Sequence, residues 1–328
     1  MPSGAPLAGG HLADHTPESA TRDFWVYGLR VRSAIDLVGW PVATPTVPDV
    51  IIRREPLTGP ELEGPLYSAR AAMADGELRV TVTGVGKYAA CGGSLIRFDA
   101  DPGAKAEDIR LYLTGSMMGI ILHQRGAFPL HASCVALPGG GGCAAFAGPS
   151  GAGKSTLVAE MIRQGSAFVS DDLCVMAPPA RGELRVWPGA ARLKLDETSL
   201  GAAAGTGSNL EPAGGGRGKF HLPMESSLHH TTPAPLHRVY VLTDGSGPPR
   251  VEPVSGLDAI AALVDQTYLL TTARDMGLTS QVFRLAAAAA RGLTVNRLVR
   301  PRGLEYLPGV ATLIEQDALH PAACLHPV

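Results

Sequence analysis

Residues 148–155 read Gly-Pro-Ser-Gly-Ala-Gly-Lys-Ser, which is a complete GxxxxGK[ST] motif. An apolar run, Cys143 to Ala147, precedes the motif, and a helical pattern from Ser155 to Arg163 follows it. This motif between a strand and a helix is typical of the phosphate loop of nucleotide-binding proteins. We therefore expect the loop's backbone N–H groups, together with the positive end of the following helix dipole, to bind the phosphates.

The residue types of the motif indicate how ATP and Mg²⁺ would bind. Lys154 is expected to bridge the β- and γ-phosphates, and the Ser155 hydroxyl is expected to ligate Mg²⁺. Glycines allow the backbone to adopt unusual dihedral angles and to approach the phosphates closely. The predicted nucleotide contacts in the motif and just after it are Gly148, Ser150, Gly151, Ala152, Gly153, Lys154, Ser155 and Thr156.

Composition narrows the class of protein. The 328 residues are 45% hydrophobic, and the formal net charge is −2, so no strong positive field predicts nucleic acid or an anionic membrane as a partner. The five cysteines form no CxxC pair, which suits a reducing compartment. The N-terminus lacks the features of a signal peptide, and no run of about 18 apolar residues spans a membrane. We predict a cytoplasmic protein.

The pattern along the chain suggests three parts. Residues 1–22 are polar and rich in Gly and Pro, and we predict a disordered tail. Residues 23–105 contain short runs of β-branched and aromatic residues, which predict a small β-rich region. Residues 106–328 begin with a helical stripe over 106–125 and then contain a predicted hairpin that leads into the phosphate loop. The Gly/Ala-rich segment 201–218 is equally compatible with an active-site lid and with a tolerated insertion.

Two adjacent carboxylates, Asp171 and Asp172, follow the phosphate loop on the next apolar run. A helix of about three turns and one return strand fit between Ser155 and this pair, so the end of the strand is expected beside the phosphates. Adjacent strand residues point to opposite faces, so both acids serve one site only if the strand ends or bulges there. We predict Asp171 as the catalytic base and Asp172 as the metal-associated acid, although the reverse assignment is open.

Histidines are the remaining candidates for chemistry. His131 lies on the strand before the glycine turn, where its position is equally compatible with contact to the acid pair and with a structural role. His221, His229, His230 and His237 form a loose group without the spacing of a standard zinc site, and polar loop positions are the better interpretation.

The ensemble LHAS at 130–133, GPSGAGKST at 148–156 and VSDD at 169–172 resembles the catalytic domain of the HPr kinase/phosphorylase family. The resemblance implies an α/β fold, with a phosphate-loop kinase core of the HPr kinase type and a mixed β-sheet, beside the small β-rich N-terminal region. It implies that His131 lies near the catalytic acid, and that Asp171, His131 and Lys154 form the catalytic set. Two further segments, ARLKLDE and GRGKFHLPM, resemble places where the family directs basic residues to the phosphates, which implicates Lys194 and Lys219.

The chain departs from the bifunctional members of that family. They follow the Lys-Ser pair of the loop with Glu, where this chain has Thr156, and their Glu-Arg-Gly signature has no match around residues 187–197. HPr as the substrate and phosphorylase activity are therefore not predicted. The segment VYGLRVRSAIDL more closely resembles divergent relatives associated with lasso-peptide modification, which phosphorylate a serine of a precursor peptide. The bifunctional relatives form hexamers, so a homo-oligomer is compatible with the resemblance, but no residue pattern here indicates a subunit number.

Three functions follow from these expectations. The first is an ATP- and Mg²⁺-dependent kinase that phosphorylates a serine hydroxyl of a peptide or protein. The second is a kinase for a small-molecule hydroxyl, which would use the same machinery with a different acceptor pocket. The third is a nucleotide-gated binding protein with little catalysis, against which the intact acid pair argues, because a binding protein has less need of a base.

Overall fold

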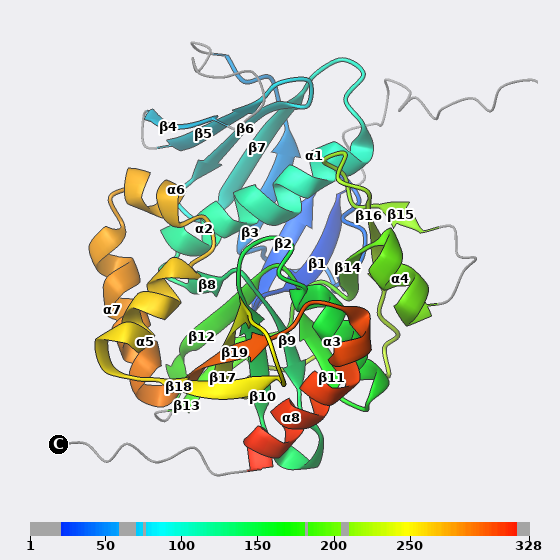
Figure 1. The fold of residues 1–328 in the computed structure, drawn as a ribbon. Coiled ribbons are helices and arrows are strands. Elements are labelled where there is room, and N and C mark those ends of the chain that lie inside the picture. Colours follow the sequence, from blue (N-terminus) through cyan, green and yellow to red (C-terminus); the bar gives the residue numbers. More distant parts are fainter. Residues whose placement is uncertain (1–20, 59–69, 75–76, 181–182, 205–209, 320–328) are drawn as a thin grey trace, which may run out of the picture.

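The computed structural model describes residues 21–58, 70–74, 77–180, 183–204 and 210–319. The chain has a mixed α/β fold. An N-terminal sheet, which contains both antiparallel and parallel strand pairs, lies above a larger mixed sheet in Figure 1. Residues 1–20 of the tail predicted over 1–22 lie outside the described residues. Arg22 is the first residue of a strand, so the tail was predicted too long at that end. No helix in the described part of the chain has the length and apolarity needed to cross a bilayer.

The N-terminal sheet has seven strands in the order β1-β2-β3-β7-β6-β5-β4. Alternate residues of its strands are buried, as in β5, because successive side chains of a strand point to opposite faces. The predicted run over 24–33 is divided into two strands by a turn at Tyr27 and Gly28, whose φ angles are 53° and 75°. The strands are β1 (Arg22–Val26), β2 (Leu29–Ser33), β3 (Val50–Arg54), β4 (Arg70–Ala74), β5 (Glu77–Val82), β6 (Gly86–Cys91) and β7 (Leu95–Ala100).

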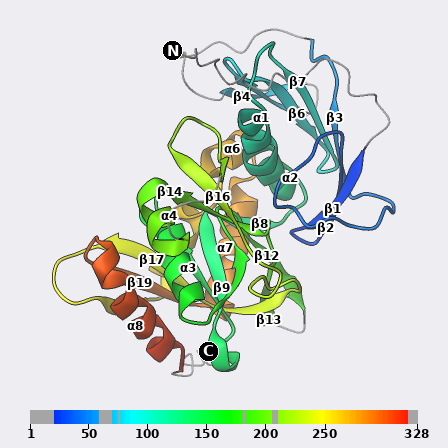
Figure 2. The same cartoon turned by 90° about the vertical axis from the view of Figure 1, so that its right-hand side faces the viewer.

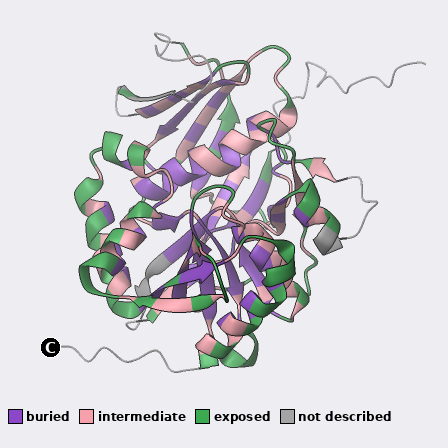
Figure 3. Cartoon of the chain, viewed as in Figure 1, coloured by how far each residue is buried: buried purple, intermediate pink, exposed green. Residues whose placement is uncertain are grey.

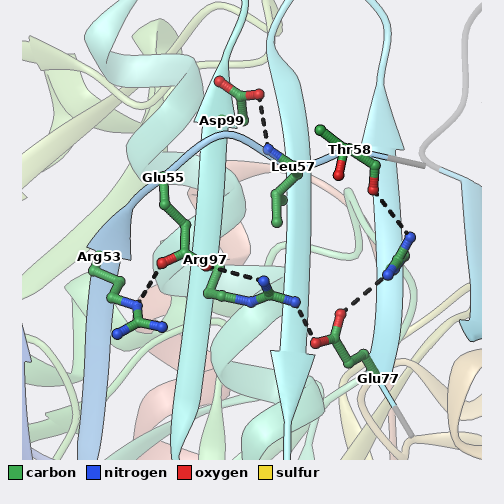
Figure 4. Close-up of polar contacts among 8 residues, drawn as sticks. Arg53, Glu55, Leu57, Thr58, Glu77, Arg97 and Asp99 are labelled. Atoms are coloured by element: carbon green, nitrogen blue, oxygen red, sulfur yellow. Dashed lines mark hydrogen bonds and ion pairs between the residues drawn. The ribbon is translucent and has the colours of Figure 1, made fainter. Parts of the chain in front are cut away.

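The outer face of this sheet carries a ladder of alternating charges (Figure 4). Arg97 bonds to Glu55, with an N–O distance of 2.9 Å, and also to Glu77 on the other side. Arg53 pairs with Glu55 at 2.7 Å, and Arg79 pairs with Glu77 at 3.4 Å. The Arg97 side chain is only 20% exposed, and the hydrogen bond to Glu55 raises its pKa. Arg97 therefore joins the two carboxylates of the ladder.

Replacing Arg97 tests this ladder. We expect Arg97→Met to lower the free energy of unfolding by about 1–2 kcal/mol, because two partly buried carboxylates would lose their shared cation. The matched control is Arg53→Met, whose side chain is 54% exposed. We expect the control to change stability by less than about 0.5 kcal/mol. Urea unfolding measures the change in the free energy of unfolding for both variants. Equal changes in Arg97→Met and Arg53→Met would show that the ladder is not centred on Arg97.

A continuous helical segment lies under the inner face of the N-terminal sheet. It consists of α1 (Ala106–Tyr112), the π-helical turn η1 (Leu113–Met117) and α2 (Met118–Gln124), and the chain turns at Gly126, where φ is 76°. The helical stripe predicted over 106–125 is thus present. Leu113, Met117 and Ile121 are fully buried against sheet residues such as Phe98. π-Turns inside helices occur frequently at functional sites.

The second sheet has nine strands and holds the phosphate loop. Its main order is β11-β9-β10-β17-β13-β12-β8, and β19 and β18 extend it beside β17. The predicted hairpin before the loop is present as β9 and β10, which pair antiparallel across a short 3-10 turn, η2 (Pro138–Gly140). The strands are β8 (Phe128–Leu130), β9 (Ala132–Ala136), β10 (Cys143–Ala147), β11 (Ala167–Ser170), β12 (Cys174–Ala180), β13 (Glu183–Trp187), β17 (Ala234–Asp244), β18 (Arg250–Val254) and β19 (Thr294–Arg300).

Helices cover both faces of this sheet, and the interior is buried throughout (Figure 3). In β10, Ala145 packs toward the layer of α5 and α7, whereas Phe146 packs toward the layer of α3 and α8. Both faces of β10 are apolar because both are covered. The helical elements of this part are α3 (Lys154–Arg163), α4 (Glu197–Ala204), α5 (Gly256–Asp265), α6 (Leu270–Asp275), α7 (Thr279–Gly292), η3 (Leu304–Tyr306) and α8 (Leu307–Leu319).

A small third sheet lies beside the phosphate-loop helix. It consists of β14 (Arg192–Asp196), β16 (Lys219–Pro223) and β15 (Glu211–Pro212), in that order. Figure 2 shows it between α4 and the helical segment under the N-terminal sheet. Leu193 and Leu195 of β14 are buried in the core. The alternate residues of this strand therefore face away from the core, toward the phosphate loop and the acid pair.

Candidate active site

The GxxxxGK[ST] motif forms the turn between β10 and α3. Gly151 and Gly153 have φ angles of 82° and 83°, in the left-handed region that favours glycine. The helix begins at Lys154, directly after the loop. The Lys154 ammonium donates to the carbonyl oxygens of Gly148 at 2.7 Å and Pro149 at 3.1 Å, so its side chain folds back along the loop. This arrangement places a cation beside the loop whose backbone N–H groups the motif predicts to bind phosphates.

Lys154 is only 5% exposed, and this burial has an electrostatic consequence. Burial lowers the pKa of Lys154 to about 8, although the carboxylates Asp172 and Asp171 act in the opposite direction. The ammonium is therefore charged at neutral pH but close to its titration range. A bound polyphosphate would favour the charged form.

Asp171 is held firmly at the end of β11. Its Oδ1 accepts from the Ser133 hydroxyl at 2.5 Å and from the Ser155 hydroxyl at 2.8 Å, and its Oδ2 accepts from the backbone N–H of Lys194 at 2.8 Å. Burial and the charge of Asp172 raise the pKa of Asp171, while these three hydrogen bonds oppose that rise. The phosphate-loop serine and the first acid are thus in direct contact, although 16 residues separate them.

Asp172 points into the pocket beside Asp171. Strand β11 ends at Ser170, and Asp172 has a φ of 63°, which is rare for a residue other than glycine. This left-handed residue removes the alternation that would send the two acids to opposite faces. Its side chain keeps 43% of its accessible surface and pairs with the Lys194 ammonium at 3.3 Å. Burial raises the pKa of Asp172, but Lys194, His131 and Lys219 offset this, so the pKa lies below its ordinary value.

His131 lies between β8 and β9 and lines the same pocket. The resemblance implied that His131 lies near the catalytic acid, and His131 lines one pocket with Asp171, but the hydroxyl of Ser133 is the group that donates to Asp171. Burial and the charge of Lys154 lower the pKa of His131 to about 4, and Asp172 partly opposes this. The imidazole is therefore neutral at neutral pH. Ser133 lies on β9, two residues beyond His131, and no motif in the sequence singled it out.

The two lysines from the third sheet also reach the pocket. Lys194 contacts Asp172, and Lys219 lies opposite Asp196 in the register of the β14–β16 strand pair. Thr156, which follows the motif, bonds through its hydroxyl to that of Ser199 in α4 at 3.0 Å. The pocket is lined by the predicted residues His131, Ser150, Gly151, Gly153, Lys154, Ser155, Thr156, Asp171, Asp172, Lys194 and Lys219.

Two predicted loop residues, Gly148 and Ala152, act through their backbones and are not among the lining residues. The Gly148 carbonyl accepts from Lys154, and the Ala152 carbonyl accepts from the Arg300 guanidinium. Arg300 lies at the end of β19 and is 5% exposed. It supports the loop through this hydrogen bond, a role that the separation of 148 positions conceals in the sequence.

The pocket has a volume of about 570 Å³ and extends beyond the predicted residues. Tyr27 and Trp40 from the N-terminal region, Thr114 from η1, Arg192 from β14 and Tyr268 after α5 also line it. The N-terminal sheet is therefore part of the wall of the site. The sequence offered no periodic or motif signal for these residues, because each one arrives from a different element.

The residues at the loop suit a magnesium ion. Mg²⁺ prefers oxygen ligands and is commonly bound by one or two carboxylates together with substrate phosphates. The Ser155 hydroxyl and the Asp171 carboxylate, 2.8 Å apart, supply such oxygens at the edge of the anion site. Within the described ranges, no group of three or more His, Cys, Asp or Glu residues that could hold a metal ion is found. The expectation that the four histidines occupy polar loops is wrong for three of them, because His221 lies in β16, His237 lies in β17 and His229 is buried.

No family model and no curated protein matches the chain. Among solved structures, the chain is similar to the HPr(Ser) kinase/phosphatase from Coxiella burnetii. The two are 14% identical over a match that covers 58% of this chain and 96% of that chain, with a TM-score of 0.33. This is a distant structural relation, so we base the function on the residues of the site.

Proposed function

We propose that the protein is a phosphotransferase that uses ATP and Mg²⁺ to phosphorylate an alcohol, with a serine hydroxyl of a peptide or protein as the acceptor. The observation that carries the proposal is the 2.8 Å contact between Ser155 of the glycine loop and Asp171, with Asp172 beside it in the same pocket. An anion site next to a carboxylate that is open to the pocket suits transfer of a phosphoryl group to an incoming hydroxyl.

The contacts support a specific division of roles. The loop amides and Lys154 would bind the β- and γ-phosphates, and Ser155 and Asp171 would hold Mg²⁺. When bound, the metal would neutralise charge on the phosphates. Asp172, rather than Asp171, is the better base, because Asp171 already accepts three hydrogen bonds. This reverses the assignment expected from the sequence.

In the proposed step, the acceptor oxygen forms a bond to the γ-phosphorus as the bond from that phosphorus to the bridging oxygen breaks. The hydroxyl proton passes to Asp172, and ADP leaves. Lys194, 3.3 Å from Asp172, keeps this carboxylate ionised and orients it. His131 is neutral at the same edge of the pocket, so it adds no competing positive charge beside the acceptor.

A direct assay tests the proposal. The full-length protein, incubated with Mg²⁺ and ATP labelled at the γ-phosphate, is expected to transfer label to serine-containing peptides and not to matched alanine peptides. A panel of small alcohols belongs in the same experiment, because the pocket is walled by aromatic residues and a small acceptor is the second candidate. Stoichiometric nucleotide binding without transfer to any acceptor would instead indicate a nucleotide-gated binding protein.

A further inference from the structure

The N-terminal region forms one part of the pocket wall. Tyr27 and Trp40 are 6% and 4% exposed, and their rings pack edge to face with centroids 6.4 Å apart. Tyr27 lies in the turn between β1 and β2, and its backbone N–H donates to the Pro188 carbonyl at 3.0 Å. Trp187, the preceding residue, leaves no room for a side chain at Gly28, since a Cβ there would lie 2.6 Å from its ring. This turn is therefore anchored in the core and brings Tyr27 to the pocket.

Strand β14 runs along the pocket between this part of the wall and the phosphate loop. Arg192, Lys194 and Asp196 alternate along its pocket side. Asp196 Oδ1 accepts from the Ser199 N–H at 2.8 Å, and Ser199 contacts Thr156 of the loop helix. Lys194 contacts the acid pair. Arg192 is therefore one strand repeat, roughly 6.6 Å, beyond Lys194 on the side away from the loop helix.

Arg192 is a half-buried cation without a charged partner of its own. Its guanidinium donates to two neutral oxygens, the Val38 carbonyl at 2.7 Å and the Thr114 hydroxyl at 3.1 Å. No carboxylate in the described part of the chain lies within ion-pair distance of it. The two acids that interact with it at longer range are already paired, Glu211 with Arg110 at 2.7 Å and Asp172 with Lys194.

This arrangement has a cost that a ligand would relieve. Burial lowers the pKa of Arg192, which shows that its surroundings disfavour the charge. A guanidinium has five N–H donors, and two of them are used in the hydrogen bonds above. A carboxylate or phosphate fits the remaining donors, and the enclosing aromatic rings would strengthen the pairing by excluding water.

We propose that the part of the pocket around Arg192, Tyr27 and Trp40 is the acceptor subsite, and that Arg192 binds a carboxylate or phosphate group carried by the acceptor. The inference rests on the proposed phosphotransferase function and adds the chemical class of its substrate. The reacting hydroxyl would lie at Asp172, with the anionic group one strand repeat away at Arg192. Tyr27 and Trp40 would form the apolar wall between the N-terminal sheet and that acceptor.

Binding of matched probes tests the inference. The full-length protein is loaded with Mg²⁺ and a non-hydrolysable ATP analogue, so that the phosphate loop is occupied, and is titrated calorimetrically. One pair of probes is glycerate and glycerol; the other is the capped dipeptides acetyl-Asp-Ser-amide and acetyl-Asn-Ser-amide. We expect the anionic member of at least one pair to bind about 10- to 100-fold more tightly than its neutral partner. The pair that shows the preference reveals whether the anion belongs to a small molecule or to a peptide.

Variants then assign the preference to Arg192. Arg192→Gln keeps an N–H donor for the Val38 carbonyl but removes the charge, and we expect it to abolish the preference. Arg192→Lys keeps the positive charge, and we expect this variant to retain part of the preference for the anionic probe. Arg250→Met is the matched control, because Arg250 is 52% exposed on β18 and pairs with Glu252.

Two results would overturn the inference: no preference for either anionic probe in the wild-type protein, or an unchanged preference in Arg192→Gln. Binding of the ATP analogue is measured in the same samples. If the analogue fails to bind, the proposed function itself fails. If it binds normally and only the anion preference is absent, the acceptor subsite alone is refuted.

Discussion

Asp172→Asn is expected to reduce phosphoryl transfer by about 10²- to 10⁴-fold, the usual contribution of a positioned general base. An asparagine has nearly the same shape but cannot take the proton of the attacking hydroxyl. Asp172 is open to the pocket, and its pKa lies below the ordinary value, so it is ionised throughout the neutral range. We therefore expect no loss of activity from its titration between pH 6 and 8.

Two measurements separate this role from nucleotide binding. The affinity for ATP in Asp172→Asn should stay within about threefold of wild type, while the single-turnover rate falls. Asp171→Asn is the matched comparison, since its acid contacts Ser155 and is expected to raise the Mg²⁺ concentration needed for half-maximal activity. If Asp172→Asn keeps full transfer and Asp171→Asn loses it without a change in Mg²⁺ dependence, the roles are the ones predicted from the sequence.

Lys154→Met is expected to weaken ATP binding by about 100-fold, because removing one partner of a buried, hydrogen-bonded charge pair has effects of that size. The methionine keeps most of the apolar stem, which is buried at the base of α3, so the fold should persist. AMP lacks the phosphates that Lys154 would contact, and its affinity should change little. Equal weakening for ATP and AMP would show a general loss of the pocket instead.

The pH dependence of ATP binding provides a second readout of Lys154. Its pKa in the free protein is about 8, and the bound phosphates favour the charged ammonium. ATP affinity should therefore be nearly constant below pH 8 and fall as pH rises through and beyond it, by up to about tenfold per unit. Lys154→Arg stays charged and should remove this decline. A decline that persists in Lys154→Arg would assign the titration to another group.

Local patterns made much of the loop and its surroundings predictable. The glycines of 148–153 and the flanking apolar and helical runs identified the turn between β10 and α3, since this motif uses contiguous residues. The period change near Ala106 likewise predicted the helical segment before the hairpin. The position of Asp171 beside Ser155 followed from a length argument, because one helix and one short strand span the distance.

Other features had no local signal. Ser133 was noted only as part of the LHAS segment, yet its hydroxyl donates to Asp171. The left-handed turn at Asp172 is unusual for aspartate, so the direction of the second acid was open. The predicted roles within the pair depended on that direction. Arg300, Arg192 and Tyr27 come from distant elements, and their places depend on how those elements pack.

The glycine loop, the hairpin before it and the nearby double aspartate were therefore readable from residue order, because each depends on neighbours within about twenty positions. The wall of the pocket could not be predicted from residue order. It joins a turn of the N-terminal sheet, a π-turn and the strand that carries Arg192, and these are brought together by burial of apolar surface across the whole chain. Burial favours any packing that excludes water, so a one-dimensional pattern records which faces are apolar but not which faces meet.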